Sequence, residues 1–319
     1  MLSSLKFVQG AVAKKDFVAA LTHFRIRDGL VKGYNGSLAL CGPIELDLSV
    51  MPKALPFIKA IQACQDTIAL HVTDTGRLSI KSGRFKAFVD CIKEEFPDVQ
   101  PEGDIIKLDG GLLEVLKKLA PFIAEDASRP WARGILFRGQ SAFATNNVVI
   151  IEYWLGYTFP VEINVPKSAV AELLRINEEP EAMQVTPHSV TFHFSNHRWL
   201  RSQTYSLDWP DIGKVLDREA TPHTFPETLF ESIHDCLIPF LEEDGGIYFM
   251  EDGSITTSYT GGLGAAVQLE PFGAVGKYNA EQFMLLDGVA ERIDLSAFPA
   301  PSLFYGDKVR GAIVGMRSV

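Results

Sequence analysis

The chain has 319 residues, of which 46% are hydrophobic and 22% charged, a composition typical of a folded globular protein. No apolar run approaches the roughly 20 residues that a membrane-spanning helix needs, and the N-terminus lacks the charged-then-apolar pattern of a secretion signal. The four cysteines show neither a C-x-x-C motif nor the spacing of a disulfide framework. We therefore expect reduced thiols and a cytoplasmic protein.

The net charge of −10 is unevenly placed along the chain. Residues 1–104 hold 13 Lys+Arg against 12 Asp+Glu, residues 105–216 hold 11 against 12, and residues 217–319 hold 6 against 16. An acidic balance argues against a protein that grips nucleic acid over its whole surface. A DNA partner remains open if the basic residues gather on one face.

The first hundred residues alternate between strand and helix patterns. A short strand is predicted over residues 5–12. A helix is predicted over 16–24, because Phe17, Leu21 and Phe24 fall at positions i, i+4 and i+7. Pro52, at a first helical position, predicts a second helix over 52–64. The remaining predicted strands are 30–34, 38–41, 44–50, 68–72 and a hairpin over 78–92.

The same order of elements returns twice. The second unit is predicted to have helices at 112–124 and 166–176, strands at 134–137, 141–144 and 148–154, and a hairpin over 190–207. The third is predicted to have helices at 226–241 and 279–289 and strands at 247–250, 254–259, 265–269, 303–305 and 309–316.

Two sequence markers measure the step between these units. An aromatic-Pro-Asp-aliphatic motif begins at Phe96 and again at Trp209, 113 residues later. A second marker begins at Met51, at Val165 and at Tyr278, with steps of 114 and 113 residues. A domain-sized step predicts an α+β protein of three tandem domains, 1–104, 105–216 and 217–319, each with two helices packed on antiparallel sheets.

In their order, these motifs resemble the β-subunit sliding clamps of bacterial DNA polymerase III and their phage-encoded relatives. The resemblance covers essentially the whole chain, and it is carried by residues 77–99, 129–137, 143–145, 165–167 with the following helix, 209–216 and 314–317. It implies a three-domain crescent, of which two copies close head-to-tail into a ring around duplex DNA. Such a homodimer is a non-enzymatic processivity factor without cofactor or metal, nucleoid-associated, and of host or phage origin.

Basic residues on or beside the predicted helices are the candidates for DNA contact. Each one alone is equally well explained as the solvated face of a soluble helix. Together with the resemblance they predict a loose phosphate-facing lining, whose members are Lys14, Lys15, Lys53, Lys59, Lys117, Lys118, Arg129, Trp131, Arg133, Lys167 and Arg175. The helix over 227–241 contains no Lys or Arg, although the resemblance would place it in the same lining.

The resemblance also implies a groove near the C-terminus that takes short apolar peptides of the DNA polymerase and the clamp loader. The matching positions are Thr145, Ile150, Ile313, Val314, Met316 and Arg317. The family's Asp-Gly-His-Arg-Leu is replaced here by residues 146–150, and its Met-Pro-Met-Arg-Leu ending by residues 314–319. We expect the apolar character of the groove to persist with a different shape.

Two alternatives remain at the level of sequence. The chain could be a clamp-like adaptor that binds replication proteins through the groove without encircling DNA. It could instead be an enzyme that uses His188, His193 and His197, which crowd one predicted hairpin. No cysteine or carboxylate stands at metal-ligand spacing beside these histidines, so a structural role is favoured and no catalytic residue is predicted.

Overall fold

The computed structural model describes residues 1–125, 128–259, 264–273 and 275–317. The chain forms two compact units, one of residues 1–113 with 168–204 and the other of residues 114–167 with 205–319. Strands from the predicted middle domain therefore contribute to both units, and the three-domain boundaries stay a prediction. No helix among the described residues is long and apolar enough to cross a bilayer.

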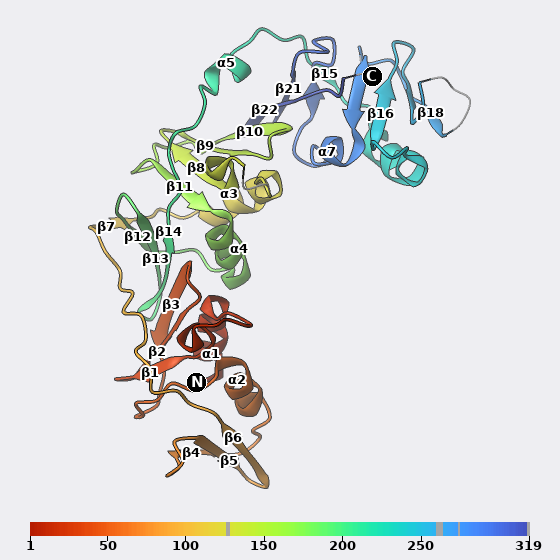
Figure 1. Cartoon of the computed structure of the whole chain (residues 1–319). Helices are drawn as coiled ribbons and strands as arrows, with labels where there is room; N and C mark the ends of the chain where they lie inside the picture. The colour runs from red at the N-terminus through yellow and green to blue at the C-terminus, as the bar shows by residue number, and fades with distance from the viewer. Residues whose placement is uncertain (126–127, 260–263, 274, 318–319) are drawn as a thin grey trace. The chain divides into compact units, whose positions relative to one another are not determined.

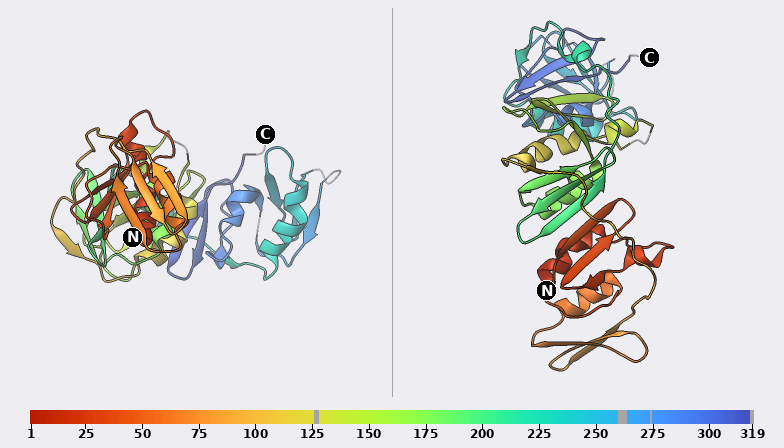
Figure 2. Two further views of the ribbon diagram at one scale, coloured as in Figure 1. Left: turned by 90° about the horizontal axis from the view of Figure 1, so that it is seen from below. Right: turned by 90° about the vertical axis from the view of Figure 1, so that its left-hand side faces the viewer.

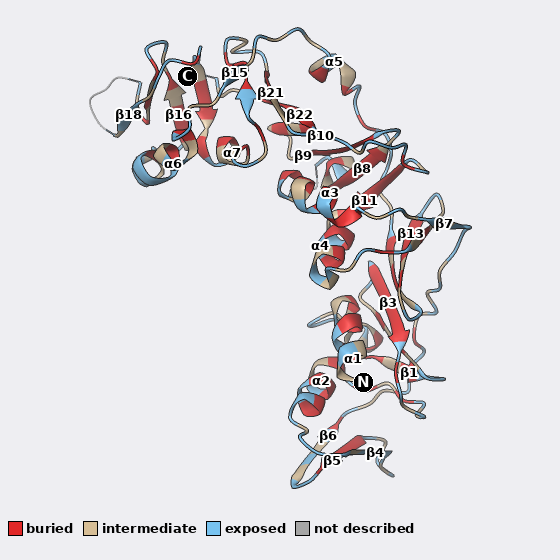
Figure 3. Cartoon of the chain, turned by 180° about the vertical axis from the view of Figure 1, so that it is seen from behind, coloured by how far each residue is buried: buried red, intermediate tan, exposed pale blue. Residues whose placement is uncertain are grey.

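The first unit is built on a seven-stranded antiparallel sheet (Figure 1). Its order is β1 (Arg25–Arg27), β2 (Leu30–Tyr34), β3 (Leu38–Pro43), β14 (Arg198–Gln203), β13 (Ser189–Phe194), β12 (Ala182–Val185) and β7 (Ile105–Lys107). The pairing of β3 with β14, in which Leu40 lies opposite Leu200, joins a hairpin of the first repeat to a hairpin of the second. Five of the six residues of β3 are buried (Figure 3).

A smaller sheet and three helices complete the first unit. The sheet has the order β4 (Ile68–Val72), β5 (Leu78–Ser82) and β6 (Phe85–Val89), and the helices are α1 (Leu2–Val8), α2 (Ala54–Gln62) and α4 (Lys167–Ile176). Helix α2 buries Phe57, Ile58 and Ile61 and exposes Lys59, which is the amphipathic pattern that the sequence predicted.

The predictions for the N-terminus are wrong in two places. The predicted strand over 5–12 is helix α1 followed by a 3₁₀ turn, Gln9–Ala11, because the buried Leu5, Val8 and Ala11 recur every three residues. The predicted helix over 16–24 is a loop followed by a 3₁₀ turn, Ala19–Thr22. The helical spacing that began at Phe17 was coincidental, since that side chain is fully exposed.

One predicted strand of the first unit is also absent as a strand. Residues 44–50 alternate in polarity, yet they form only an isolated bridge between Val50 and Ile26. The contact continues past Pro52, because Phe24 N donates to Pro52 O (3.0 Å) and Lys53 is bridged to His23, but these isolated bridges do not make a strand.

The second unit contains an eight-stranded and a four-stranded antiparallel sheet. The first has the order β11 (Ile163–Pro166), β8 (Gly134–Arg138), β9 (Ser141–Thr145), β10 (Val149–Trp154), β22 (Val309–Ile313), β21 (Ser302–Gly306), β20 (Arg292–Ile293) and β15 (His223–Thr224). The second has the order β18 (Ala266–Gln268), β17 (Ser254–Thr256), β16 (Gly246–Phe249) and β19 (Gly276–Asn279). The pairing of β10 with β22 joins the second repeat to the third.

The helices of this unit are α3 (Leu112–Leu119), α5 (Gly213–Leu216), α6 (Leu229–Ser232) and α7 (Ala280–Met284). Helix α6 continues into a π-helical segment, Ile233–Leu237, and both pack beside the four-stranded sheet (Figure 2). Helices α2, α4 and α7 begin at residues 54, 167 and 280, at intervals of 113 residues. The step read from the sequence is therefore a step between equivalent helices.

Asp294 links separate segments of the second unit and should make its stability depend on acid. The carboxylate accepts hydrogen bonds from the backbone N–H groups of Thr221 (2.9 Å) and Ser296 (3.1 Å). Burial opposes the charge of this group, but a bond from the Ser296 hydroxyl (2.5 Å) and these two backbone bonds outweigh burial and lower the pKa of Asp294. A lowered carboxyl pKa adds stability that is present above the unfolded value and lost as the pH falls through the folded value.

We expect Asp294→Asn to lower the unfolding free energy by about 1–3 kcal/mol at pH 7, because buried donors lose their charged acceptor. The difference from the unaltered protein should shrink as the pH falls below about 4. Denaturant unfolding at several pH values measures both effects. Asp287→Asn, at an exposed position of the same unit, is the control and should change neither.

Candidate DNA and peptide interfaces

Four of the predicted DNA-contacting lysines lie exposed on the first unit. Lys14 and Lys15 lie on the loop between the two 3₁₀ turns rather than beside a helix, and Lys53 and Lys59 lie at the start and within helix α2. The chain that follows the loop is attached to the start of α2, because Phe24 N donates to Pro52 O (3.0 Å). These two lysine-bearing segments are therefore neighbours in the folded unit.

Several other predicted contacts already have partners within the protein. Lys118 Nζ donates to Gly288 O (2.8 Å), and Lys167 forms an ion pair with Glu125 that lowers the pKa of that carboxyl. Arg175 forms an ion pair with the buried Glu172 and also donates to the carbonyls of Lys6 (3.2 Å) and Phe7 (2.8 Å). Lys117, on α3, is exposed. Arg175 in particular has a structural role in attaching α4 to the end of α1.

The remaining three candidates lie around the 3₁₀ turn Pro130–Arg133. Arg129 donates to Asn147 Oδ1 (3.2 Å), and Arg133 Nε is buried without an acceptor among the described residues. The ring of Trp131 packs on that of Trp209, with centroids 5.0 Å apart, against the buried core of the eight-stranded sheet. Trp131, the aromatic residue that the resemblance assigned to DNA contact, is therefore half-buried and packs against the core.

This packing predicts that Trp131→Ala acts first on stability. Removing a half-buried indole should lower the unfolding free energy by about 2 kcal/mol. Trp154→Ala, at a side chain that is 54% exposed in β10, is the matched control and should cost far less. Thermal unfolding of both variants measures the difference. Equal melting temperatures for the two variants would show that the Trp131–Trp209 contact carries no stability.

The predicted groove positions divide between two faces of the eight-stranded sheet. Ile150 lies opposite Thr145 on β9 and opposite Ala312 on β22, and residues opposite each other share a face. Val314, two residues beyond Ala312, continues on that face, and its N–H donates to Val148 O (2.9 Å). Ile313 points to the other face and is fully buried.

The exposed part of this face is apolar. Val314 is 44% exposed, and Ile150 and Val215 of helix α5 are partly buried and pack against one buried cluster. Beneath them lies the buried cluster of Leu136, Phe143, Trp209, Ile212, Leu216, Leu303 and Ala312. Thr145 is buried and its hydroxyl donates to Val149 O (2.8 Å), so it shapes this face from within. Sequence reasoning missed Val215, although it lies in the stretch 209–216 that carries the resemblance.

Beyond Val314 the chain leaves this sheet and runs beside β19. Met316 N donates to Lys277 O (2.7 Å), and Gly315 packs so closely on the ring of Phe298 that a Cβ would lie 2.6 Å from it. Arg317 is exposed. The groove positions Val314, Met316 and Arg317 therefore lie along the passage from one sheet to the next.

A cleft of about 460 Å³ opens beside this passage. Aromatic and apolar side chains dominate its lining, which includes Tyr248, Tyr259, Val275 and Phe298. Lys277 crosses its floor, with Nζ paired to Asp244 and 4.9 Å from the Tyr248 ring centroid. Burial lowers the pKa of Lys277, but its bonds to Asp244 and Tyr248 outweigh burial and raise it. The ammonium therefore stays charged at neutral pH.

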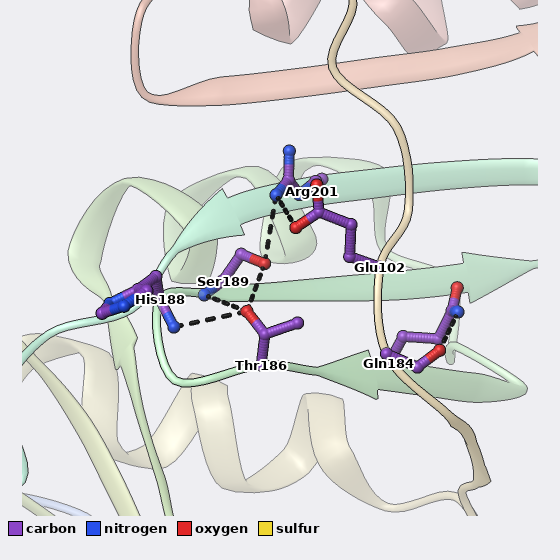
Figure 4. Close-up of polar contacts among 7 residues, drawn as sticks. Glu102, Gln184, Thr186, His188, Ser189 and Arg201 are labelled. Carbon is purple, nitrogen blue, oxygen red and sulfur yellow. Dashed lines mark hydrogen bonds and ion pairs between the residues drawn. The ribbon is translucent and has the colours of Figure 1, made fainter.

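The histidine hairpin has structural contacts instead of a constellation for catalysis. His193 Nε2 lies 2.6 Å from Gln184 Oε1, and Gln184 Nε2 donates to Gly103 O (2.6 Å). Burial lowers the pKa of His193. Figure 4 shows the neighbouring contacts, in which Arg201 donates to Glu102 (2.7 Å) and to Ser189 (3.3 Å). The described residues contain no group of three His, Cys, Asp or Glu that could hold a metal ion.

No protein-family model and no curated protein sequence matches this chain. Solved structures do match it over nearly its whole length. The DNA polymerase III β subunit of Caulobacter crescentus has a TM-score of 0.84 at 17% identity, and the match covers 99% of this chain and 97% of that one.

Two further structures give the same result. The DNA polymerase III β subunit of Pseudomonas aeruginosa has a TM-score of 0.82 at 18% identity, with 99% of this chain and 97% of that chain covered. The DNA polymerase sliding clamp of Bacillus subtilis has a TM-score of 0.80 at 15% identity, with 100% and 97% covered. The chain therefore has the fold of the bacterial DNA polymerase III β sliding clamps, a mixed fold of helices and antiparallel sheets.

Proposed function

We propose that the protein is a DNA sliding clamp, a non-enzymatic ring that encircles duplex DNA and tethers a replicative DNA polymerase to its template. The observation that carries this proposal is the fold, which matches β sliding clamps over 99% of this chain and 97% of theirs. The function then depends on how the fold is closed, what it slides on and what it binds.

Ring closure requires complementary edges, and two edge strands are the proposed pair. Strand β4 is at the edge of the three-stranded sheet and β18 at the edge of the four-stranded sheet. Both strands are largely exposed, and an open strand edge is prone to uncontrolled pairing unless it is covered. Head-to-tail pairing of β4 of one copy with β18 of another covers both edges and closes a homodimer.

Sliding requires contact with phosphates that is weak and independent of sequence. The exposed Lys14, Lys15, Lys53, Lys59 and Lys117 provide a modest positive charge in a protein of net charge −10. The acidic remainder repels phosphates, so the bound protein can move along the duplex. Retention on DNA then depends on encirclement rather than on affinity.

The ring makes a clear prediction about mass and about DNA topology. Light scattering should give about twice the chain mass of 35.2 kDa. Protein loaded on nicked circular DNA should remain after a high-salt wash, whereas protein on linear DNA should dissociate. Val72→Asp, at an exposed position of β4, should give monomers and abolish retention, and Ile105→Asp on β7 should do neither.

A monomer at all micromolar concentrations would contradict encirclement. It would favour the adaptor alternative, in which the chain binds replication proteins without surrounding DNA. Equal release from linear and circular DNA would contradict it independently.

The apolar face around Ile150, Val215 and Val314, together with the neighbouring cleft, is the proposed site for partner peptides. A sliding clamp of the same fold from Pseudomonas aeruginosa has been solved bound to griselimycin. Here the partners would be short apolar segments of the DNA polymerase and the clamp loader. Burying one Leu or Phe of such a segment contributes roughly 1.5–3 kcal/mol.

Val314→Asp should therefore weaken polymerase binding at least tenfold, because it places a charge in the apolar contact. Its melting temperature should stay close to that of the unaltered protein, since the side chain is 44% exposed. Ile105→Asp is the matched control on another sheet. Surface-immobilised protein and the replicative polymerase of the same cell provide the measurement. Undiminished binding by the Val314 variant would place the peptide site elsewhere.

A further inference from the structure

The loop of residues 12–18 presents an aromatic side chain entirely to water. Phe17 has a relative exposure of 109%, and the neighbouring Val18 is 52% exposed. A single exposed apolar residue is common on protein surfaces. Three further observations distinguish Phe17 from such a residue.

The first observation is that the loop is held in shape by its own hydrogen bonds. Ala13 N donates to Leu21 O (2.9 Å) and closes the base of the loop. Near the tip, Val18 N donates to Asp16 Oδ1 (2.9 Å). Phe17 lies between the two residues of this turn. The exposure of its ring therefore results from a backbone conformation that hydrogen bonds define.

The second observation is the charge around the ring. Lys14 and Lys15 are both exposed within the loop. Lys53 is also exposed, and it is bridged to His23, which follows the loop in the chain. Asp16 is the only acid of the loop, and its carboxylate is engaged by Val18 N. An aromatic ring among lysines suits a polyanion that also offers flat π-faces.

The third observation comes from the second repeat, where an equivalent hydrogen bond closes a segment with other residues. Ala124 N donates to Ala132 O (3.1 Å), and this closure also spans eight residues. Counted from the closing alanine, Glu125 replaces Lys14, Asp126 replaces Lys15 and Ser128 replaces Phe17. The loop therefore closes without the lysine pair or the aromatic, which leaves those residues available for binding.

We propose that the loop of residues 12–18 binds unpaired bases of DNA, with Phe17 stacked on a base and Lys14 and Lys15 paired with adjacent phosphates. Bases inside a duplex are covered on both faces by their neighbours, so an exposed ring stacks most readily on single-stranded DNA. The contact is tolerant of sequence because every base has a π-face. It depends on the proposed function for its DNA partner, and it adds a single-strand contact to a protein that otherwise needs only the duplex.

The probe is Phe17→Trp, whose fluorescence reports stacking directly. A 20-nucleotide oligo(dT) should quench the added emission, and a blunt duplex of equal length should quench it much less. Replacing both lysines by alanine in the Phe17→Trp protein should raise the half-saturating oligo(dT) concentration at least threefold at low salt. Phe17→Ser, the residue of the second repeat, should weaken oligo(dT) binding about fivefold, the lower end of what aromatic stacking contributes.

Phe240→Trp is the matched control. Phe240 is 58% exposed, but it stands beside Glu242 and Glu243, so its probe should not respond to oligo(dT). Equal quenching of both probes would overturn the proposal, as would equal quenching of the Phe17 probe by duplex and single strand. A larger response to phosphatidylserine vesicles than to oligo(dT) would also overturn it and would identify the loop as a membrane contact.

Retention on nicked circles, measured in parallel, separates this proposal from the clamp function. Phe17→Ser should remain on circles as the unaltered protein does, because encirclement does not depend on stacking. Quenching of the Phe17 probe without retention of the unaltered protein would refute the clamp and support the loop contact. Retention of the unaltered protein without quenching of the Phe17 probe would support the clamp and refute the loop contact.

Discussion

Backbone pairing between strands of different repeats is the constraint on which the rest of the molecule depends. Strand β3 pairs with β14, and β10 pairs with β22, so each of the large sheets combines strands from two repeats. The hydrogen bonds of such a ladder are fixed in register, because a slip by one residue would turn every side chain to the opposite face. At the second junction this register places Ile150, Ala312 and, beyond the strand, Val314 on one face. The proposed peptide site is thus a consequence of the junction that holds two repeats together.

The same sheets decide which charged residues are available to ligands. Arg175 is ion-paired with Glu172 and donates to two carbonyls at the end of α1, and Lys167 is ion-paired with Glu125. The ring of Trp131 packs on the ring of Trp209. Of the residues predicted to contact DNA, the exposed ones lie mainly on the first unit, on or beside α2 and on the loop that precedes β1. Weak contact of this kind suits a protein that holds DNA by topology, since tight phosphate binding would oppose sliding.

Equivalent loops in successive repeats have diverged while their closure persists. The hydrogen bonds from Ala13 to Leu21 and from Ala124 to Ala132 have the same span and nearly the same length. The first loop carries lysines and a phenylalanine, and the second carries acids and a serine at the corresponding positions. A scaffold that tolerates both sets of side chains places little structural constraint on them. The proposed single-strand contact follows from this asymmetry between the repeats.

The sequence by itself determined the repeat, its step, most strands and the second helix of each repeat. Helices α2, α4 and α7 were predictable because a proline or asparagine at their start precedes an apolar stripe. Local patterns failed at the N-terminus, where the segment of helix α1 was interpreted as a strand and the spacing that begins at the exposed Phe17 was interpreted as a helix. The contacts of Arg175 with the carbonyls of Lys6 and Phe7, and of Trp131 with Trp209, could not be predicted either, because each joins residues distant in sequence. Only the tertiary structure decided which basic residues are free and which apolar ones line a surface, since availability depends on what packs against each side chain.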